Sequence, residues 1–157
     1  MICIALTQGQ HAVVDNDDWE LVSRFNWCAT KKQHTFYAVA NSNKLFEQRN
    51  VWLHRIIMGI TDSSISIDHK DGNGLNNCRS NLRICDKQQN ARNCKIHTRN
   101  TTGFKGVSFD KDIKKYRAFI TLNGKTKHLG CFVSPVDAHA AYCSAAIKHY
   151  GEFARFE

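Results

Sequence analysis

The chain has 157 residues and a mass of 17.9 kDa, enough for one ordinary domain or two small ones, which excludes a large multidomain enzyme. No stretch approaches 18 consecutive apolar residues, and the first residues lack the pattern of a secretory signal, so we expect a soluble, cytoplasmic protein without a membrane partner. The 22 lysines and arginines exceed the 14 aspartates and glutamates and give a formal net charge of +8. This excess favours a polyanionic partner, and a basic surface without such a role is the alternative.

Seven cysteines are spread irregularly along the chain, and none belongs to a Cys-x-x-Cys pair. An odd number without a compact framework predicts reduced thiols rather than disulfides. Cys78, Cys85 and Cys94 do not pair and would leave a zinc ion short of its usual four ligands. We therefore expect no structural zinc.

The first of three blocks, residues 1–58, predicts a series of short strands. Short apolar and aromatic runs indicate strands at residues 2–6, 12–14, 25–29 and 35–40, whereas residues 51–58 have a helical pattern. The sequence leaves open whether this block is an independent domain or a layer of strands packed onto the next block. We expect the layer.

The second block, residues 65–97, predicts strand, strand and helix in that order. The first strand ends in the polar pair Asp68 and His69, and a turn-rich loop leads to the returning strand. Asp86 with Gln89 three residues later forms a capping-box pattern, which indicates the start of the helix.

Four polar residues of this block suggest a metal-assisted reaction. Asp68 and Asn90 offer the hard oxygen atoms that Mg²⁺ or Mn²⁺ prefers, and a neutral His69 imidazole beside such a metal can take a proton from water. Consecutive strand residues point to opposite faces, so Asp68 and His69 share a face only where the strand ends or twists. Asn81 lies on the returning strand. The alternative to a reactive site is that these residues form an ordinary polar turn between two strands.

The third block follows a polar segment at residues 98–102 that we expect to be a linker. Residues 103–132 predict a meander of two or three strands with an Asn-Gly turn at 123–124. Ser134 and Pro135 indicate a helix start and Gly151 its end. The helix face expected on the sheet consists of Ala138, Ala141, Tyr142 and Ala145.

The second block, IDHKDGNGLNNCRSNLRICDKQQNARN, closely resembles the HNH motif of phage and intron-encoded homing endonucleases. This resemblance implies a ββα-metal unit that binds one divalent cation, Mg²⁺ or Mn²⁺. It implies that His69 is the general base, that Asp68 and Asn90 are the metal ligands, and that Asn81 braces the loop and orients His69. The resemblance extends upstream to LHRII at residues 53–57 and to the N-terminal segment.

Basic residues flank this predicted centre. Arg83 and Arg92 are candidate phosphate contacts, and for each the alternative is an ordinary solvated basic face. His54 of the LHR element either approaches the site or packs the core, and we favour packing or bracing.

The third block resembles an AP2 domain along nearly its whole length, with GVSFD, YRAFI, HLGCF, the helix DAHAAYCSAAIKHYG and a terminal EFAR in order. Such domains lay a three-stranded antiparallel sheet into the DNA major groove, packed on one helix. Strand alternation predicts that Tyr116, Ala118, Ile120 and Leu122 face the helix. The expected DNA-facing set is Lys105, Ser108, Lys115, Arg117, Lys125, Lys127 and His128.

Together these patterns predict an α+β protein of two parts: an HNH nuclease region at residues 1–97, with its ββα-metal core at about 65–97, and an AP2-like DNA-binding domain at 103–157. The expected function is a metal-dependent DNA endonuclease of the phage homing type, located in the cytoplasm of an infected host cell. Its expected partner is double-stranded DNA, with no obligatory protein partner. The sequence leaves open whether a monomer nicks one strand or a dimer cuts both strands. The alternatives are a DNA-binding transcriptional regulator with an inactive HNH centre and an RNA-directed or structural nucleic-acid binder.

Overall fold

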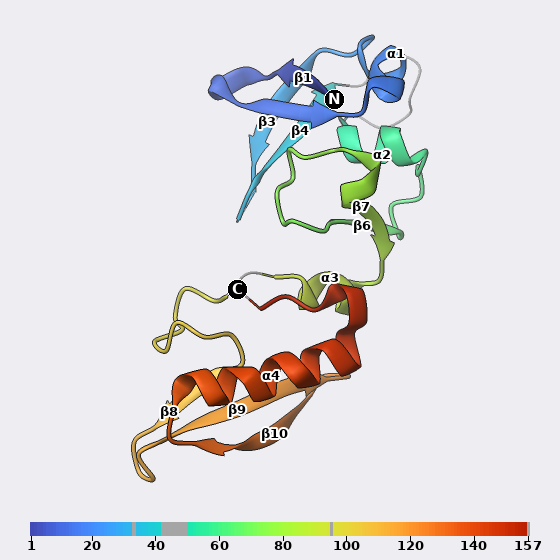
Figure 1. The fold of residues 1–157 in the computed structure, drawn as a ribbon. Coiled ribbons are helices and arrows are strands. Elements are labelled where there is room, and N and C mark those ends of the chain that lie inside the picture. The colour runs from blue at the N-terminus through green and yellow to red at the C-terminus, as the bar shows by residue number, and fades with distance from the viewer. Residues whose placement is uncertain (33, 42–49, 95, 157) are drawn as a thin grey trace. The chain divides into compact units, whose positions relative to one another are not determined.

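The computed structural model describes residues 1–32, 34–41, 50–94 and 96–156, and these fall into two compact units (Figure 1). The first unit runs over Met1–Lys87 and the second over Gln88–Glu157. Each unit has a hydrophobic core of its own. Within the described ranges, no helix is long and apolar enough to cross a membrane.

The described residues of the first unit form small antiparallel sheets and two short α-helices. Its first two sheets are formed by β1 (Ile2–Ala5) with β2 (His11–Val14), and by β3 (Trp27–Lys31), β4 (Phe36–Asn41) and β5 (Asn50–Trp52) in that order. The third is the ribbon of β6 (Ser66–His69) and β7 (Leu82–Cys85). The helices are α1 (Trp19–Val22) and α2 (Leu53–Met58).

These elements confirm the strands expected in the first two blocks, with shifts of one or two residues at their ends. The helix expected at residues 51–58 is wrong for its first two residues. Val51 pairs with Ala40 across β5 and β4, so the helix begins only at Leu53. The pattern of apolar residues did not separate a three-residue edge strand from the helix that follows it.

One core joins the N-terminal strands to the β6–β7 ribbon. Its buried side chains include Val14 from β2 and Leu82 from β7. The backbone of Val13 also bonds to the loop after β6: its N–H donates to the Leu75 carbonyl at 2.9 Å, and its carbonyl accepts from the Asn77 N–H at 2.8 Å. The first block is therefore a layer of strands packed onto the ribbon, as expected.

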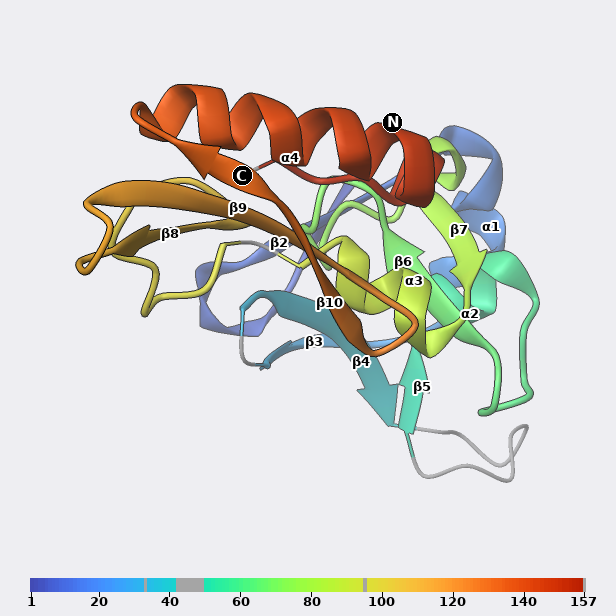
Figure 2. The same cartoon turned by 90° about the horizontal axis from the view of Figure 1, so that it is seen from below.

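The second unit is a three-stranded antiparallel sheet covered on one face by a long helix (Figure 2). The sheet has the order β10-β9-β8, with β8 (Val107–Asp110), β9 (Lys115–Leu122) and β10 (Lys125–Phe132). The helices are α3 (Lys87–Arg92), which begins at the division between the units, and α4 (Pro135–Tyr150).

Helix α4 begins and ends as the sequence predicts. The Ser134 hydroxyl accepts a hydrogen bond from the Val136 N–H at 3.2 Å, Pro135 is the first helical residue, and Gly151 closes the helix with a φ of 55°. The alternation along β9 is also confirmed, because Ala118 and Ile120 are buried while Arg117 and Thr121 are exposed. Small side chains such as Ala138 and Ala146 let the helix approach the sheet closely.

The expected linker, residues 98–102, is a hydrogen-bonded turn inside the second unit. The Asn100 side chain accepts from the backbone N–H groups of Thr102 at 2.9 Å and Gly103 at 2.8 Å, and donates to the Phe104 carbonyl at 2.8 Å. The division between the two compact units falls after Lys87 instead, so α3 belongs to the second unit except for its first residue. A functional boundary at residues 98–102 stays a prediction.

The close approach of Gly106 to α4 gives a stability prediction. A Cβ atom at Gly106 would lie 2.1 Å from the Tyr142 ring, whereas one at Gly103 would meet nothing within 4 Å, and both residues have a φ near 70° to 75°. We expect Gly103→Ala to cost about 1 kcal/mol of unfolding free energy for its backbone alone. Gly106→Ala should cost about 1–3 kcal/mol more, because the Tyr142 ring must move. Urea unfolding of the two variants measures the difference, and equal losses would contradict a tight contact.

Candidate active site

Asp68 and His69 are the last two residues of β6, and the register of the ribbon determines where they point. Asp68 lies opposite Arg83 of β7, and His69 lies opposite Leu82. Directly opposed residues share a face and consecutive residues alternate, so Asp68 and Arg83 lie on one face of the ribbon and His69 and Leu82 on the other. Asp68 and His69 are both buried, with 6% and 4% of their surfaces exposed.

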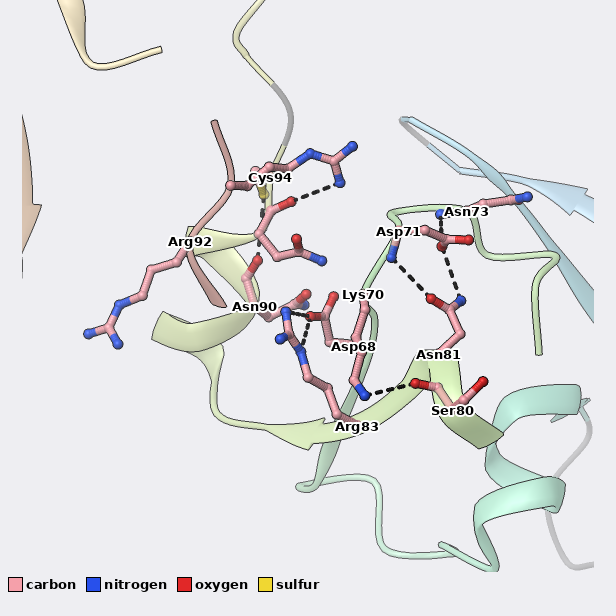
Figure 3. Close-up of polar contacts among 12 residues, drawn as sticks. Asp68, Lys70, Asp71, Asn73, Ser80, Asn81, Arg83, Asn90, Arg92 and Cys94 are labelled. Carbon is pink, nitrogen blue, oxygen red and sulfur yellow. Dashed lines mark hydrogen bonds and ion pairs between the residues drawn. The ribbon is translucent and has the colours of Figure 1, made fainter. Parts of the chain in front are cut away.

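Arg83 holds the Asp68 carboxylate (Figure 3). Its Nε and Nη2 atoms donate to the same oxygen, Oδ2, at 2.8 and 2.7 Å, and the arginine is itself only 9% exposed. Removal of either partner from such a buried pair leaves a charge without compensation, which is strongly destabilising. Arg83 therefore acts on Asp68 in this structure, and its contact with a DNA phosphate stays a prediction.

His69 is held through its Nε2 atom, which lies 3.3 Å from Oδ1 of the fully buried Asn77. The Asn77 amide nitrogen donates to the Gly74 carbonyl at 3.5 Å, so Oδ1 is the acceptor and His69 Nε2 carries the proton. Burial lowers the pKa of His69 below 6.5, although the Asn77 bond and the charges of Asp71 and Asp68 oppose the shift. At neutral pH the imidazole is neutral, and Nδ1 is the nitrogen that can accept a proton.

Aromatic rings pack around the imidazole of His69. The ring centroid of Tyr37 lies 5.7 Å from that of His69 and the centroid of His54 lies 5.2 Å from it, both edge to face. Burial lowers the pKa of His54 from 6.5 to about 3, and the nearby His69 and Arg55 lower it further. The packing role expected for His54 therefore agrees with a neutral ring that contacts the candidate base.

Asn81 braces the loop between the two strands (Figure 3). Its amide nitrogen donates to Asp71 Oδ1 at 3.0 Å and to the Asn76 carbonyl at 2.7 Å, and its oxygen accepts from the Asp71 N–H at 3.1 Å. His69 instead donates a hydrogen bond to Asn77, a partner that the sequence did not reveal. The adjacent asparagines of the LNN segment were a signal, but their spacing did not show which one is buried under the histidine.

Gly74 lets this loop lie close to β4. A Cβ atom there would be 2.5 Å from the Phe36 carbonyl oxygen and 2.7 Å from the Tyr37 ring. The Gly74 N–H also donates to the Thr35 hydroxyl at 3.0 Å. The loop that carries Asn77 is thus seated on the strand that carries Tyr37, and both contact His69.

The chemistry of Asp68 fits a hard divalent cation. Its carboxylate is the ligand type that Mg²⁺ and Mn²⁺ prefer, and Mg²⁺ often takes only one or two carboxylates and completes its shell with water and phosphate oxygens. Within the described part of the chain, no group of three or more histidines, cysteines, aspartates or glutamates is placed to hold a metal ion. Asn90 lies on α3 in the second unit, so its pairing with Asp68 stays a prediction.

Lys105 of the second unit is tied to the end of α3. Its Nζ atom donates to the carbonyl of Arg92 at 3.0 Å and also to that of Cys94. Burial lowers the pKa of Lys105 to about 8. Lys105 therefore satisfies backbone carbonyls at a helix C-terminus, and contact of its ammonium group with DNA stays a prediction.

The sheet register divides the remaining residues of the expected DNA-facing set between two faces. Ser108 lies opposite Arg117, and His128 lies opposite Phe119, on the face away from α4. Lys127 lies opposite Ile120, whose side chain packs against α4. The outer face therefore carries Ser108, Lys115, Arg117 and His128, whereas Lys125 and Lys127 share the face of Ile120 and Leu122.

A buried carboxylate beside a buried neutral imidazole, at the end of a two-stranded ribbon, defines a candidate hydrolytic centre. No protein-family model and no solved structure matches the chain. An uncharacterized HNH endonuclease of Acanthamoeba polyphaga mimivirus is 33% identical over 152 residues, which are 94% of this chain and 74% of the viral protein. Protein 3.8 of Escherichia phage T7 is 31% identical over 109 residues, 69% of this chain and 89% of the phage protein. The chain therefore belongs to the family of HNH endonucleases.

The lowered pKa values of His54 and His69 predict how stability depends on pH. Their side chains bind protons more readily in the unfolded chain, whose histidine pKa is about 6.5, than in the folded one. For His54 the free energy of unfolding should therefore fall as the pH drops from 6.5 toward 3, by up to about 1.4 kcal/mol per pH unit. For His69 it should fall in the same direction below pH 6.5.

The substitution His54→Phe keeps an aromatic ring but removes one of the two side chains that take up a proton on unfolding. Urea unfolding at a series of pH values should show a flatter decline for His54→Phe than for the unmodified chain. The matched control is His11→Phe, at an exposed position of β2, which should keep the original slope. A steep decline that persists in His54→Phe would show that His54 is not buried in the neutral form.

Proposed function

We propose that this chain is a metal-dependent endonuclease that hydrolyses phosphodiester bonds of double-stranded DNA. The observation that carries the proposal is His69, a neutral imidazole whose Nε2 proton is bonded to Asn77 and whose Nδ1 can accept a proton. The mimiviral relative, named an HNH endonuclease, supports the same reaction class.

In the proposed mechanism, His69 takes a proton from a water molecule that attacks the phosphorus in line with the leaving 3′-oxygen. Asn77 keeps the ring in the tautomer with a basic Nδ1, and Asn81 holds the loop that carries Asn77. The charges of Asp71 and Asp68 favour the imidazolium that forms, since both raise the pKa of His69.

Asp68 and Asn90 are the proposed ligands of one Mg²⁺ or Mn²⁺ ion. When bound there, such a cation would supply positive charge beside the reacting phosphate. Arg83 fixes the orientation of the Asp68 carboxylate through Oδ2.

The second unit is the proposed DNA-positioning part, of the AP2 type. Its three-stranded antiparallel sheet, packed on one helix, supports this, because a sheet of this size can enter the major groove. Its outer face presents Arg117 and His128. The similarity to a phage protein supports a phage origin, and the homing type is part of the same proposal. One proposed site per chain allows a monomer that nicks and a dimer that cuts both strands.

Cleavage of supercoiled plasmid DNA tests the nuclease. The unmodified chain, His69→Ala and His11→Ala are each incubated with Mg²⁺, Mn²⁺ or a chelator, and with phage genomic DNA as a second substrate. We expect metal-dependent conversion to open-circle or linear DNA, retained by His11→Ala and reduced at least about a hundredfold by His69→Ala, because a general base contributes this much.

Circular dichroism and DNA binding of His69→Ala serve as controls, and both should match those of the unmodified chain. Equal cleavage by His69→Ala and the unmodified chain would remove His69 as the base. Binding without cleavage under any metal would favour a DNA-binding regulator with an inactive centre.

DNA binding by the outer face of the sheet is tested with a matched pair of charge removals. We expect Arg117→Gln to weaken binding to duplex DNA and to lower the slope of log affinity against log salt by about 0.9, the value for one phosphate contact. Lys127→Gln removes the same charge from the opposite face and should change the slope less. Fluorescence anisotropy over a salt series measures both, and a larger effect of Lys127→Gln would place the DNA on the other face.

A further inference from the structure

The sheet β3-β4-β5 has one face in the core of the first unit and one face beside His69. Ala38 of β4 is buried in the core. Tyr37, its neighbour in β4, points the other way, and its ring lies 5.7 Å from that of His69. Trp52 of β5 pairs with Val39 and therefore shares the face of Tyr37, whose ring it meets edge to face at 5.8 Å. Two aromatic rings thus extend this face outward from the candidate base.

Lys32, the first residue after β3, places a positive charge on the same face. Its backbone N–H donates to the Thr35 carbonyl at 2.9 Å, which continues the pairing of β3 with β4. Its ammonium group lies 5.6 Å from the centroid of the Trp52 ring, a cation–π contact. The side chain is exposed, and no hydrogen bond or ion pair with another described residue engages the ammonium group. Only the rings of Trp52 and Tyr37 separate this charge from His69.

The hairpin that carries Lys32 is fixed relative to His69. The Gly74 N–H donates to the Thr35 hydroxyl at 3.0 Å, within the turn between β3 and β4. Gly74 also lies so close to β4 that a Cβ atom there would be 2.5 Å from the Phe36 carbonyl oxygen. The loop that holds His69 through Asn77 therefore also holds the turn beside Lys32.

The charge of this face is not balanced by nearby carboxylates of its own elements. The sequences of β3, β4, β5, α2 and the turn at residues 32–35 contain no aspartate or glutamate, and their positively charged residues are Lys31, Lys32 and Arg55. The two carboxylates that act on His69 already have partners, because Asp68 is bound by Arg83 and Asp71 by Asn81. An excess of positive charge beside the candidate base favours an anionic partner on this face.

We propose that this face is a DNA-binding surface of the first unit, on which Lys32 binds a backbone phosphate of the strand presented to His69. The inference rests on the proposed nuclease and gives it a substrate contact outside the second unit. Phosphates of one strand follow one another about every 3.4 Å along the helix axis. A lysine separated from the base by two rings therefore reaches a phosphate a few nucleotides from the bond that is cut. Because an ammonium group is a point charge, this contact sets the position of the strand and does not read its sequence.

The neighbouring lysine supplies a matched control. Lys31 is also exposed, and its ammonium group also rests on an aromatic ring, 5.8 Å from the centroid of Phe36. The register puts Lys31 opposite Phe36, on the face of Ala38 and away from Tyr37. Lys31→Gln and Lys32→Gln therefore remove the same charge from the two faces of one hairpin.

Binding of the full chain to duplex DNA is measured by fluorescence anisotropy over a salt series, with a chelator present so that no strand is cut. We expect Lys32→Gln to lower the slope of log affinity against log salt by about 0.9, the value for one phosphate contact, and Lys31→Gln to leave the slope unchanged. In metal-dependent cleavage of plasmid DNA, Lys32→Gln should raise KM several-fold at an unchanged kcat, because the contact is equally strong before and during the reaction.

The two readouts separate this surface from the nuclease itself. Equal slopes for Lys32→Gln and the unmodified chain, with cleavage intact, would overturn the surface while the nuclease stands. A larger loss in Lys31→Gln would also overturn it, because that charge lies on the other face. A slope lowered by Lys32→Gln alone, without cleavage under any metal, would keep the phosphate contact and overturn the nuclease.

Discussion

The β6–β7 ribbon cannot bury its own side chains, and the candidate site depends on how this constraint is met. Two strands of four residues have no interior, so such a ribbon is at best marginally stable alone. The N-terminal strands and α2 supply a core that receives Leu82 on one face of the ribbon. His69 lies on that same face because it is opposite Leu82. The packing that stabilises the ribbon therefore also removes water from the imidazole and keeps it neutral, as a general base must be.

The other face of the ribbon has the opposite electrostatic character. Asp68 and Arg83 are directly opposed across the strands and form a buried pair through Oδ2. Because side chains alternate along a strand, two adjacent residues place a charged carboxylate and a neutral base on opposite faces of the ribbon. Each of the two side chains has its own partner. The loop after β6 adds the third constraint, because Asn81 braces it from within while Asn77 reaches His69. The positions of base and carboxylate are consequences of one register, so a shift of one residue would destroy both.

The second unit forms its core in a different way, between one sheet and a single helix. Alanines on α4 let the helix lie close to β9, and Gly106 lets the preceding segment touch Tyr142. Lysine and arginine side chains, Lys105 and Arg155, are used to satisfy carbonyls at the end of α3 rather than to face solvent. A basic composition is therefore not the same as a basic surface, because part of the charge that suggests a nucleic-acid partner stabilises the backbone.

The sequence by itself determined most of the local structure and the main chemical groups: the strands of all three blocks, the capped α4 helix, and Asp68 and His69 at the end of β6. These follow from short-range rules of alternation, turn residues and caps, which act between residues near in sequence. Only the tertiary structure decided that Val51 belongs to a strand, that Asn77 holds His69, that Arg83 is bound to Asp68, and that Arg117 and Lys127 lie on opposite faces. Each of these depends on strand register or on packing between segments far apart in sequence, and neither is encoded in the local pattern of residues.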